Sequence, residues 1–363
     1  MIYPAFILLA VLFVAYSNGA NDNFKGVATL FGSGTTGYGK ALAWGTLTTF
    51  AGSLTALLLS EKLVARFSGR GLVPEALVGS PGFVGAVALA VALTVFAATL
   101  LSFPVSTTHA LTGALVGAGL VKAGGEVHFG VLGAAFVLPL VASPIIAMAL
   151  TLVLYPAAHG LRVRAGIRRE ACVCLGRVWV PVALAPGGTA AVAGEKLEIA
   201  TCQERYQGTI LSMTAQGALD GAHFLSAGAV SFARGLNDTP KIVALLVAAR
   251  AMDLRGGMLL AGLVMGLGAI LQARRVAETM SRGITPMNHG QGFCANLVTA
   301  ALVLAASRLG LPVSTTQVSC GSLFGIGVLT RQARWRTIGT LVLAWVLTLP
   351  AAALLAAAAA GLL

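Results

Sequence analysis

Charged side chains are scarce in this sequence of 363 residues. Asp, Glu, Lys and Arg together make up 10% of the chain, whereas soluble domains carry roughly a quarter. A chain of this length with so few charges cannot cover its surface in water, so a soluble globular protein is excluded. The hydrophobic content of 57% also excludes a disordered chain. The composition is that of a protein that crosses a membrane several times.

Cysteines and acidic residues are also few. Five cysteines cannot form the dense disulfide framework of a small secreted protein. Cys172 and Cys174 are close in sequence, but one pair offers too few ligands for a metal site. Lys and Arg number 24 against 12 Asp and Glu, an excess expected of loops that face an anionic cytoplasmic leaflet. We therefore expect membrane lipid, and no nucleic acid, as a partner.

Long apolar segments fill most of the chain. A bilayer is spanned by about 20 residues of helix, and helices are expected because an open sheet edge is not stable in hydrocarbon. Only residues 159–207 are polar and basic enough to form a water-exposed loop. We predict an all-α polytopic membrane protein with apolar segments at about 2–16, 41–60, 83–102, 105–121, 129–158, 210–232, 242–252, 257–273, 293–306, 312–329 and 338–363.

Two motifs each occur once in either half of the chain. SNGANDNFK at 17–25 matches ARGLNDTPK at 233–241, an offset of 216 residues. FPVSTTH at 103–109 matches LPVSTTQ at 311–317, an offset of 208 residues. Two ordered matches at nearly the same offset indicate homologous halves. The predicted domains are a first repeat at 1–158, the loop at 159–207 and a second repeat at 208–363.

The charges of equivalent loops favour repeats that are inverted in the membrane. Residues 122–128 contain one lysine and one glutamate, whereas the equivalent residues 331–336 contain three arginines and no acid. The positive-inside rule places these loops on opposite sides, with 159–207 in the cytoplasm. Inverted repeats are typical of secondary transporters. We expect a multi-pass protein of the cell (inner) membrane, with both termini outside.

The Asn-Asp motifs place ionisable side chains at membrane depth. Asp22 and Lys25 directly follow an apolar run, in which Gly19 is expected to break the helix. Asp238 and Lys241 hold the equivalent places in the second half. An ionisable group inside a bilayer is costly unless it is paired or lines a cavity, so these residues are functional candidates. The alternative is a purely structural salt bridge at the end of a helix.

Each Pro-Val-Ser-Thr-Thr block predicts the beginning of a helix. Proline suits the first turn, where hydroxyl groups and free backbone N–H groups can donate to an anion. Broken helices that aim such ends at a central site recur in transporters. Alternatively, the hydroxyl groups bond only to their own helix. The candidate anion ligands are Ser106, Thr107, Thr108, Ser314, Thr315 and Thr316.

The paired motifs resemble those of the inorganic phosphate transporter (PiT) family. The resemblance rests on GAND near the start, GLND after the central loop, RVAET at 275–279 and the two PVSTT blocks. It implies about twelve transmembrane segments, including broken helices, in two inverted repeats. It also implies a transporter and not an enzyme: one that imports inorganic phosphate with a sodium or proton gradient, by alternating access at a midplane site. The resemblance is compatible with a homo-oligomer and does not fix the oligomeric state.

The same resemblance implies roles for individual residues. Asn21, Asp22, Asn237 and Asp238 would bind the coupling cation and contribute to the phosphate site together with the hydroxyl residues. Glu61 and Glu278 would be supporting acids for ion coupling. No organic cofactor is implied, and a bound sodium ion would lie at the two Asn-Asp pairs.

The chain departs from the family pattern at Lys25, where asparagine is usual. Together with Lys241, which the family shares, it forms a symmetric lysine pair that can bind an oxyanion and that opposes sodium. Gln317 also replaces the histidine found at His109, and Leu236 replaces the usual alanine. The two halves of the site are therefore not chemically identical.

Phosphate is the preferred anion because it keeps a proton near neutral pH and can donate to Asp22 or Asp238. A sulfate permease is the first alternative, since the two lysines could neutralise the two aspartates and leave only donors. An anion channel is another alternative, and its uptake would never exceed electrochemical equilibrium. An intramembrane hydrolase would use Ser106 or Ser314 as nucleophile, with a base among His109, His223 and His289, but no third orienting group is evident.

Overall fold

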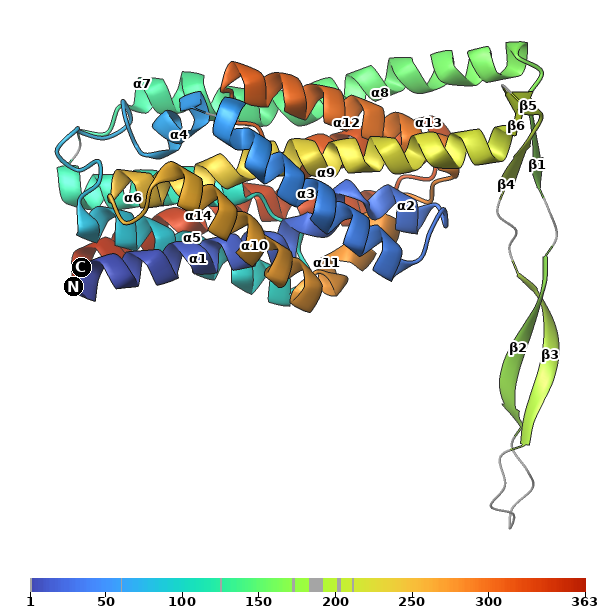
Figure 1. Cartoon of the computed structure of the whole chain (residues 1–363), viewed down its shortest axis with the longest axis horizontal. Helices are drawn as coiled ribbons and strands as arrows, with labels where there is room; N and C mark the ends of the chain where they lie inside the picture. The colour runs from blue at the N-terminus through green and yellow to red at the C-terminus, as the bar shows by residue number, and fades with distance from the viewer. Residues whose placement is uncertain are drawn as a thin grey trace. The chain divides into compact units, whose positions relative to one another are not determined.

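The structure is a computed structural model that describes residues 2–59, 61–124, 126–171, 174–182, 192–200, 204–210 and 212–363. These residues are mostly helical, as expected (Figure 1). Contacts divide the chain into a helical unit, Met1–Ala158 with Asp220–Leu363, and a central unit, His159–Leu219. Cys172 and Cys202 lie outside the described residues, so the cysteine pair stays a feature of the sequence alone.

In the first half of the chain, the described residues form eight α-helices, a 3₁₀ turn and a π-helical turn. They are α1 (Ile2–Asp22), η1 (Asn23–Gly26), α2 (Ala28–Gly32), α3 (Tyr38–Leu59), α4 (Glu61–Phe67), α5 (Pro81–Leu100), α6 (Thr107–Ala123), α7 (Phe129–Val131), η2 (Leu132–Val137) and α8 (Leu138–Arg164).

The second half follows the central unit. Its elements are α9 (Ala215–Ala248), α10 (Leu254–Gln272), α11 (Arg274–Glu278), η3 (Thr279–Gly283), α12 (His289–Leu309), α13 (Thr315–Thr330) and α14 (Trp335–Leu362). Local signals explain several of these bounds. Asn288 and Gln291 form a capping box at the beginning of α12, and Gly310 ends it with a φ of 70°.

Seven stretches in the described part of the chain are helical, long and apolar enough to cross a membrane. They are Pro4–Gly26, Tyr38–Leu59, Pro81–Leu100, Phe129–Arg164, Leu254–Gln272, His289–Leu309 and Trp335–Leu362. Helices α6 and α13 have 17 and 16 residues and are mostly buried among the others. The polytopic membrane class is therefore confirmed, whereas the number of about twelve segments stays a prediction.

Two expectations about helix breaks are wrong. The segments expected at 210–232 and 242–252 belong to one helix, α9, which continues through Asn237, Asp238 and the internal Pro240. Gly19 does not break α1 either; a Cβ there would overlap the backbone oxygen of Met265 in α10. The glycine serves close helix packing, and the polar side chains of α9 are tolerated because they find buried partners.

The central unit contains strands, so the chain is not all-α. The strands among its described residues are β1 (Arg168–Ala171), β2 (Cys174–Val182), β3 (Val192–Ala200), β4 (Glu204–Gln207), β5 (Thr209–Ile210) and β6 (Met213–Thr214). They form three antiparallel pairs, β1 with β4, β2 with β3 and β5 with β6, in which Arg168 lies opposite Gln207 and Cys174 opposite Ala200. The segment predicted as a loop is thus a series of hairpin pairings.

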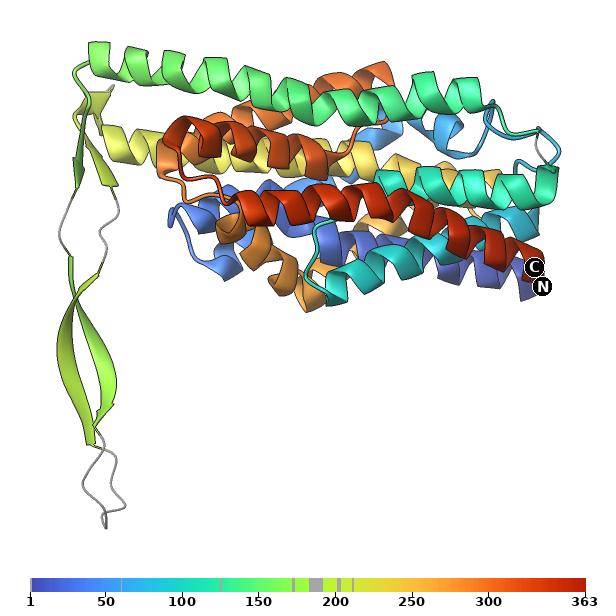
Figure 2. The ribbon, with the colours of Figure 1, turned by 180° about the vertical axis from the view of Figure 1, so that it is seen from behind.

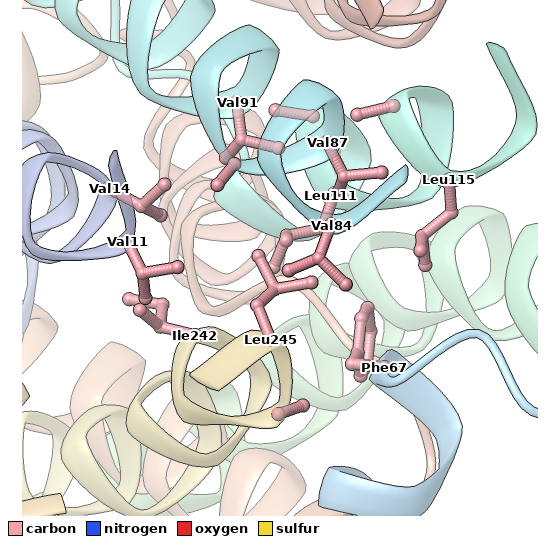
Figure 3. Close-up of a cluster of buried hydrophobic side chains, with 14 of the residues drawn as sticks. Val11, Val14, Phe67, Val84, Val87, Val91, Leu111, Leu115, Ile242 and Leu245 are labelled. Atoms are coloured by element: carbon pink, nitrogen blue, oxygen red, sulfur yellow. The ribbon is translucent and has the colours of Figure 1, made fainter. Parts of the chain in front are cut away.

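The largest apolar core joins helices from both halves of the chain. Figure 3 shows Val11 and Val14 of α1 and Val87 of α5 facing Ile242 and Leu245 of α9. These side chains are fully buried. Because lipid is as apolar as this core, close van der Waals packing is a main source of helix association. The core therefore packs helices of the two halves against each other.

The helices α1 and α9, which carry the two Asn-Asp motifs, run in opposite directions. In Figure 1, α1 runs away from the two termini, and α9, followed from Asp220, runs back toward them. Figure 2 shows that α14 begins at the other end of the helical unit and ends beside the N-terminus. A helix of 28 residues is about 42 Å long. The arginine-rich turn before α14 and the C-terminus therefore lie at opposite ends of the helical unit.

Helices α6 and α13, which begin at the two Pro-Val-Ser-Thr-Thr motifs, each pack on the last long helix of the other half. In α6, a Cβ on Gly113 or Gly117 would overlap backbone oxygens of α14. In α13, a Cβ on the equivalent Gly321 would overlap the backbone oxygen of Pro144 in α8, and one on Gly325 would crowd Thr151 of the same helix. Glycine permits this approach because it has no side chain. The last helix of each repeat thus holds the motif helix of the other.

We expect Gly117→Val to destabilise the protein by about 1–3 kcal/mol, because the new side chain must push α6 away from α14. The measurement is the thermal unfolding midpoint of the purified protein in detergent. Gly339→Ala is the matched control, since a Cβ at this position of α14 meets no atom within 4 Å. If Gly117→Val unfolds at the same temperature as Gly339→Ala, the close contact is not important for stability.

Candidate functional site

Five charged side chains are buried together in the helical unit. They are Asp22, Lys25, Arg234, Asp238 and Lys241, and each is at most 3% exposed. Among the residues whose burial the structure describes, no other Asp, Glu, Lys or Arg is buried. Burying a charge is costly unless it is paired and hydrogen-bonded. The sequence motifs predicted four of these five residues, and the fold brings all of them into one cluster.

Lys25 follows α1 in the turn η1 and connects the first Asn-Asp motif with both hydroxyl motifs. Its ammonium group forms a salt bridge with Asp22 and donates to Asn21 Oδ1 at 2.8 Å. It also donates to the carbonyl oxygen of Val105 at 2.9 Å and to Thr316 Oγ1 at 2.8 Å. The 3₁₀ turn directs the lysine back onto the last turn of α1.

Lys241 makes the equivalent contacts in the second half. Its ammonium group lies 3.5 Å from Asp238 Oδ1 and donates to the carbonyl oxygen of Val313 at 2.8 Å. It also donates to Thr108 Oγ1 at 2.8 Å. The spacing of three residues within α9 puts Asp238 and Lys241 on the same helix face.

The contacts are exchanged between the halves. Lys25 of the first half reaches Thr316 of the second, and Lys241 of the second half reaches Thr108 of the first. These two threonines are the last hydroxyl residues of their motifs. Each lysine also bonds a carbonyl oxygen just before the hydroxyl residues of its own half. The two halves of the site are therefore incomplete without each other.

The middle threonine of each motif donates to the aspartate of its own half. Thr107 Oγ1 lies 2.8 Å from Asp22 Oδ2, and Thr315 Oγ1 lies 3.4 Å from Asp238 Oδ2. The two serines behave differently. Ser106 and Ser314 are N-caps, and each side chain accepts from the backbone N–H three residues later, at 3.1 and 3.2 Å. The two serine hydroxyls therefore follow the alternative interpretation, in which a hydroxyl group bonds to its own helix.

The two asparagines hold the chain just before the hydroxyl helices. Asn21 Nδ2 donates to the carbonyl oxygen of Phe103 at 2.9 Å, while its Oδ1 accepts from the backbone N–H of Val105 at 3.1 Å. Asn237 Nδ2 donates to the carbonyl oxygen of Val313 at 3.2 Å. Each Asn-Asp motif thus contacts the Pro-Val-Ser-Thr-Thr block of its own half.

Arg234 is the buried charge that the motif analysis missed as a candidate. Its guanidinium group donates to Asn18 Oδ1 at 2.6 Å and to Asn23 Oδ1 at 2.9 Å, and its Nε lies 3.7 Å from Asp238 Oδ2. Asn18 in turn donates to Asp22 Oδ2 at 2.8 Å. Arg234 matches Asn18 at the 216-residue offset, so a mismatch between the repeats was the signal in the sequence.

Glu61 and Glu278 do not lie in this cluster. Glu61 begins the short helix α4 and is exposed. Glu278 ends α11, is half exposed and lies 3.9 Å from Arg282 in an exposed ion pair. Both acids lie where short helices reach the surface of the helical unit. In this structure neither contacts the buried carboxylates, so an ion-coupling role for them has no geometric support.

The three histidines proposed for a hydrolase do not activate the serines. His109 Nε2 lies 3.3 Å from the side-chain amide of Gln317, its equivalent in the second motif. His223 and His289 both lie 3.1 Å from Thr35 Oγ1, and His289 lies 2.5 Å from Asp220. With both serines used as helix caps, no described contact joins a serine hydroxyl to a histidine ring.

The cluster has the chemistry of an oxyanion site. It contains ammonium, guanidinium and hydroxyl donors, which form strong charge-assisted bonds with oxyanions. It also contains carboxylates, which can accept from a protonated anion. In the described part of the chain, no three His, Cys, Asp or Glu side chains converge on a metal-binding arrangement. Of the oxygens that the sequence suggested for sodium, those of Asn21, Asp22 and Asp238 bond the two lysines, whereas Asn237 Oδ1 accepts from the hydroxyl of Ser307.

Comparison with known proteins agrees with this chemistry. The model of the phosphate transporter family matches residues 18–356. A probable low-affinity inorganic phosphate transporter of Rhizobium meliloti is 28% identical over 97% of this chain and 93% of its own length. The chloroplastic inorganic phosphate transporter 2-1 of Arabidopsis thaliana is 26% identical over 96% of this chain and 70% of its own length.

A solved structure has the same fold. That of a sodium-dependent phosphate transporter superposes with a TM-score of 0.78, covering 100% of this chain and 99% of its own, at 20% identity. The relatives and the fold are those of transporters, so the hydrolase alternative is wrong. The resemblance seen in the motifs is confirmed. Since the family model covers nearly all of the sequence, this chain belongs to the phosphate transporter family.

Proposed function

We propose that this protein is a secondary active transporter that imports inorganic phosphate with a sodium or proton gradient. The observation that carries the proposal is the exchange of contacts between the halves, in which Lys25 bonds Thr316 and Lys241 bonds Thr108. A site made jointly by two packed halves can change its access when the helices that line it move relative to each other. The buried donors would bind the phosphate oxygens.

Phosphate fits the site better than sulfate does. Both aspartates accept from threonine hydroxyls, so an anion that brings its own proton can replace such a donor. The family and the relatives named above are phosphate transporters, and the comparisons give no support to the sulfate alternative. We therefore propose phosphate as the substrate, at a site that includes both aspartates, both lysines and the threonines of both motifs.

We propose alternating access by two inverted repeats. The opposite directions of α1 and α9 in Figure 1 support an inverted arrangement. The interlocked packing of α6 on α14 and of α13 on α8 supports a movement in which both halves take part. The substrate would then be enclosed between the Asn-Asp motifs and the beginnings of α6 and α13.

The test is uptake of radiolabelled phosphate into proteoliposomes that contain the purified protein. We expect accumulation above electrochemical equilibrium under an imposed sodium or proton gradient, competition by arsenate, and little competition by sulfate. A flux that only equilibrates would indicate a channel. Strong inhibition by sulfate would contradict the choice of phosphate, and no uptake under either gradient would contradict the transport function.

We expect Asp22→Asn and Asp238→Asn each to reduce phosphate uptake at least tenfold, equivalent to about 1.4 kcal/mol. Each change removes a carboxylate that accepts from an ammonium and a threonine hydroxyl. Uptake is measured at equal protein content, with elution as a single peak in size-exclusion chromatography as the check on folding. Glu126→Gln, at an exposed position, is the matched control and should transport normally. Full uptake by either aspartate variant would remove that residue from the mechanism.

We also propose an orientation with both termini outside and residues 159–207 and 331–336 in the cytoplasm of the cell that carries the protein. A cysteine at Glu126 should react with an impermeant maleimide in intact cells, whereas a cysteine at Arg334 should react only after permeabilisation. Both positions are exposed, and the native cysteines are replaced for the measurement. The opposite labelling pattern would reverse the orientation.

A further inference from the structure

The buried cluster has more positive than negative groups. Lys25 and Lys241 each pair with the aspartate three residues earlier. Arg234 is the third cation, and the described residues hold no third buried carboxylate to pair with it. Its Nε approaches Asp238 Oδ2 at 3.7 Å, but Lys241 already shares that carboxylate. With every group in its usual charge state, the cluster has one positive charge in excess.

The guanidinium of Arg234 donates its hydrogen bonds to neutral acceptors. They are the side-chain oxygens of Asn18, Asn23 and Thr49, at 2.6, 2.9 and 3.2 Å, and the backbone oxygen of Asn18 at 3.4 Å. Its buried Nε has no hydrogen-bond partner in the structure. A guanidinium does not give up its proton in proteins, so it cannot relieve this burial by becoming neutral. Binding of an anion would offset the excess charge.

Arg234 also lies between the two halves of the site. It contacts Asp238 directly and is connected to Asp22 through the amide of Asn18. The equivalent position of the first half is Asn18 itself, so the two repeats supply one guanidinium and not two. This asymmetry gives the otherwise paired cluster its single excess charge.

A sodium ion would have to compete with these cations. It would raise the excess from one positive charge to two, and the carboxylate oxygens that it prefers as ligands already bond ammonium groups. Phosphate carries one or two negative charges near neutral pH and lowers the excess instead. The charge balance therefore favours binding of the anion without sodium.

We infer that Arg234 is a built-in cation that allows the buried site to bind phosphate without a companion sodium ion. This inference rests on the proposed function, and of the two coupling cations named there it selects the proton. Arg234 thereby determines which ion gradient the transporter uses. It does so as a fixed charge that lies next to Asp238 and is connected to Asp22 through Asn18.

The first experiment is equilibrium binding of radiolabelled inorganic phosphate to the purified protein, in sodium chloride and in choline chloride of equal ionic strength. We expect the same Kd within about twofold in the two salts. Uptake into proteoliposomes without sodium should be driven by a pH gradient, acid outside. Tenfold tighter binding in sodium would overturn the inference but leave the phosphate transport function standing. No binding in either salt would contradict both.

The second experiment compares Arg234→Gln with Arg234→Lys. Without its fixed charge, Arg234→Gln should bind phosphate at least tenfold more weakly in choline and recover most of that loss in sodium. Arg234→Lys keeps the charge and should remain indifferent to sodium, even if its affinity falls. Arg308→Gln, the same change at an exposed position, is the control.

The second experiment decides whether the guanidinium of Arg234 takes the place of a bound cation. If Arg234→Gln binds as weakly in sodium as in choline, or if Arg234→Lys becomes sodium-dependent, the guanidinium does not replace a cation. Should Arg234→Gln fail to fold, as judged by size-exclusion chromatography, the wild-type protein and Arg234→Lys in the two salts still decide the matter. Sodium-dependent binding by either of these proteins would overturn the inference.

Discussion

The cost of burying charge is the constraint on which this structure depends. Five charged side chains, Asp, Lys and Arg, lie in the interior of the described part of the chain, and an isolated charge buried away from water is unstable by several kcal/mol. The fold meets this cost with ion pairs, with asparagine amides and with the threonine hydroxyls at the beginnings of α6 and α13. Because those beginnings come from opposite halves of the chain, the charges can be satisfied only when the halves are assembled. The contacts that stabilise these charges are therefore the ones that the proposed function assigns to substrate recognition.

The division of labour within the hydroxyl motifs follows from helix geometry. The serine precedes the first helical residue, where its side chain can accept from an unpaired backbone N–H. The two threonines lie within the first turn, so their hydroxyls point at neighbouring groups. One reaches the aspartate of its own half and the other lies near the lysine of the opposite half. In each motif the serine hydroxyl therefore caps the helix, and the two threonine hydroxyls contact the charged cluster.

Most of this cluster could be predicted from the sequence because its signals are local and occur twice. The repeated Asn-Asp and Pro-Val-Ser-Thr-Thr motifs pointed to Asp22, Lys25, Asp238 and Lys241 without reference to the fold. The pairing of each lysine with the threonine of the other half could not be predicted, since it depends on how the halves pack. Arg234 was missed for the opposite reason, because it occurs in one repeat only and a search for repetition discards it.

The errors about local structure also have physical causes. Gly19 was expected to end a helix, but inside a packed bundle a glycine removes the obstacle to a neighbouring backbone, here that of Met265. The polar stretch of α9 was expected to interrupt a membrane segment, yet its charges have partners within the protein and the helix continues. The strands of the central unit depend on tertiary structure, which neither composition nor motif spacing predicts. The exposed positions of Glu61 and Glu278 depend on it too, and their role in ion coupling stays a prediction.

The glycine contacts of α6 and α13 have a mechanical consequence. Since α6 is held by α14 and α13 by α8, each hydroxyl motif is fastened to the final long helix of the opposite repeat. A hinge motion that separated one half from the other would have to break the close contacts of α6 with α14 and of α13 with α8 at the same time. In the proposed alternating access, α6 and α14 would therefore move as one rigid pair and α13 and α8 as another. Each of these moving pairs would contain one helix from either half of the chain, so the moving units would differ from the two repeats.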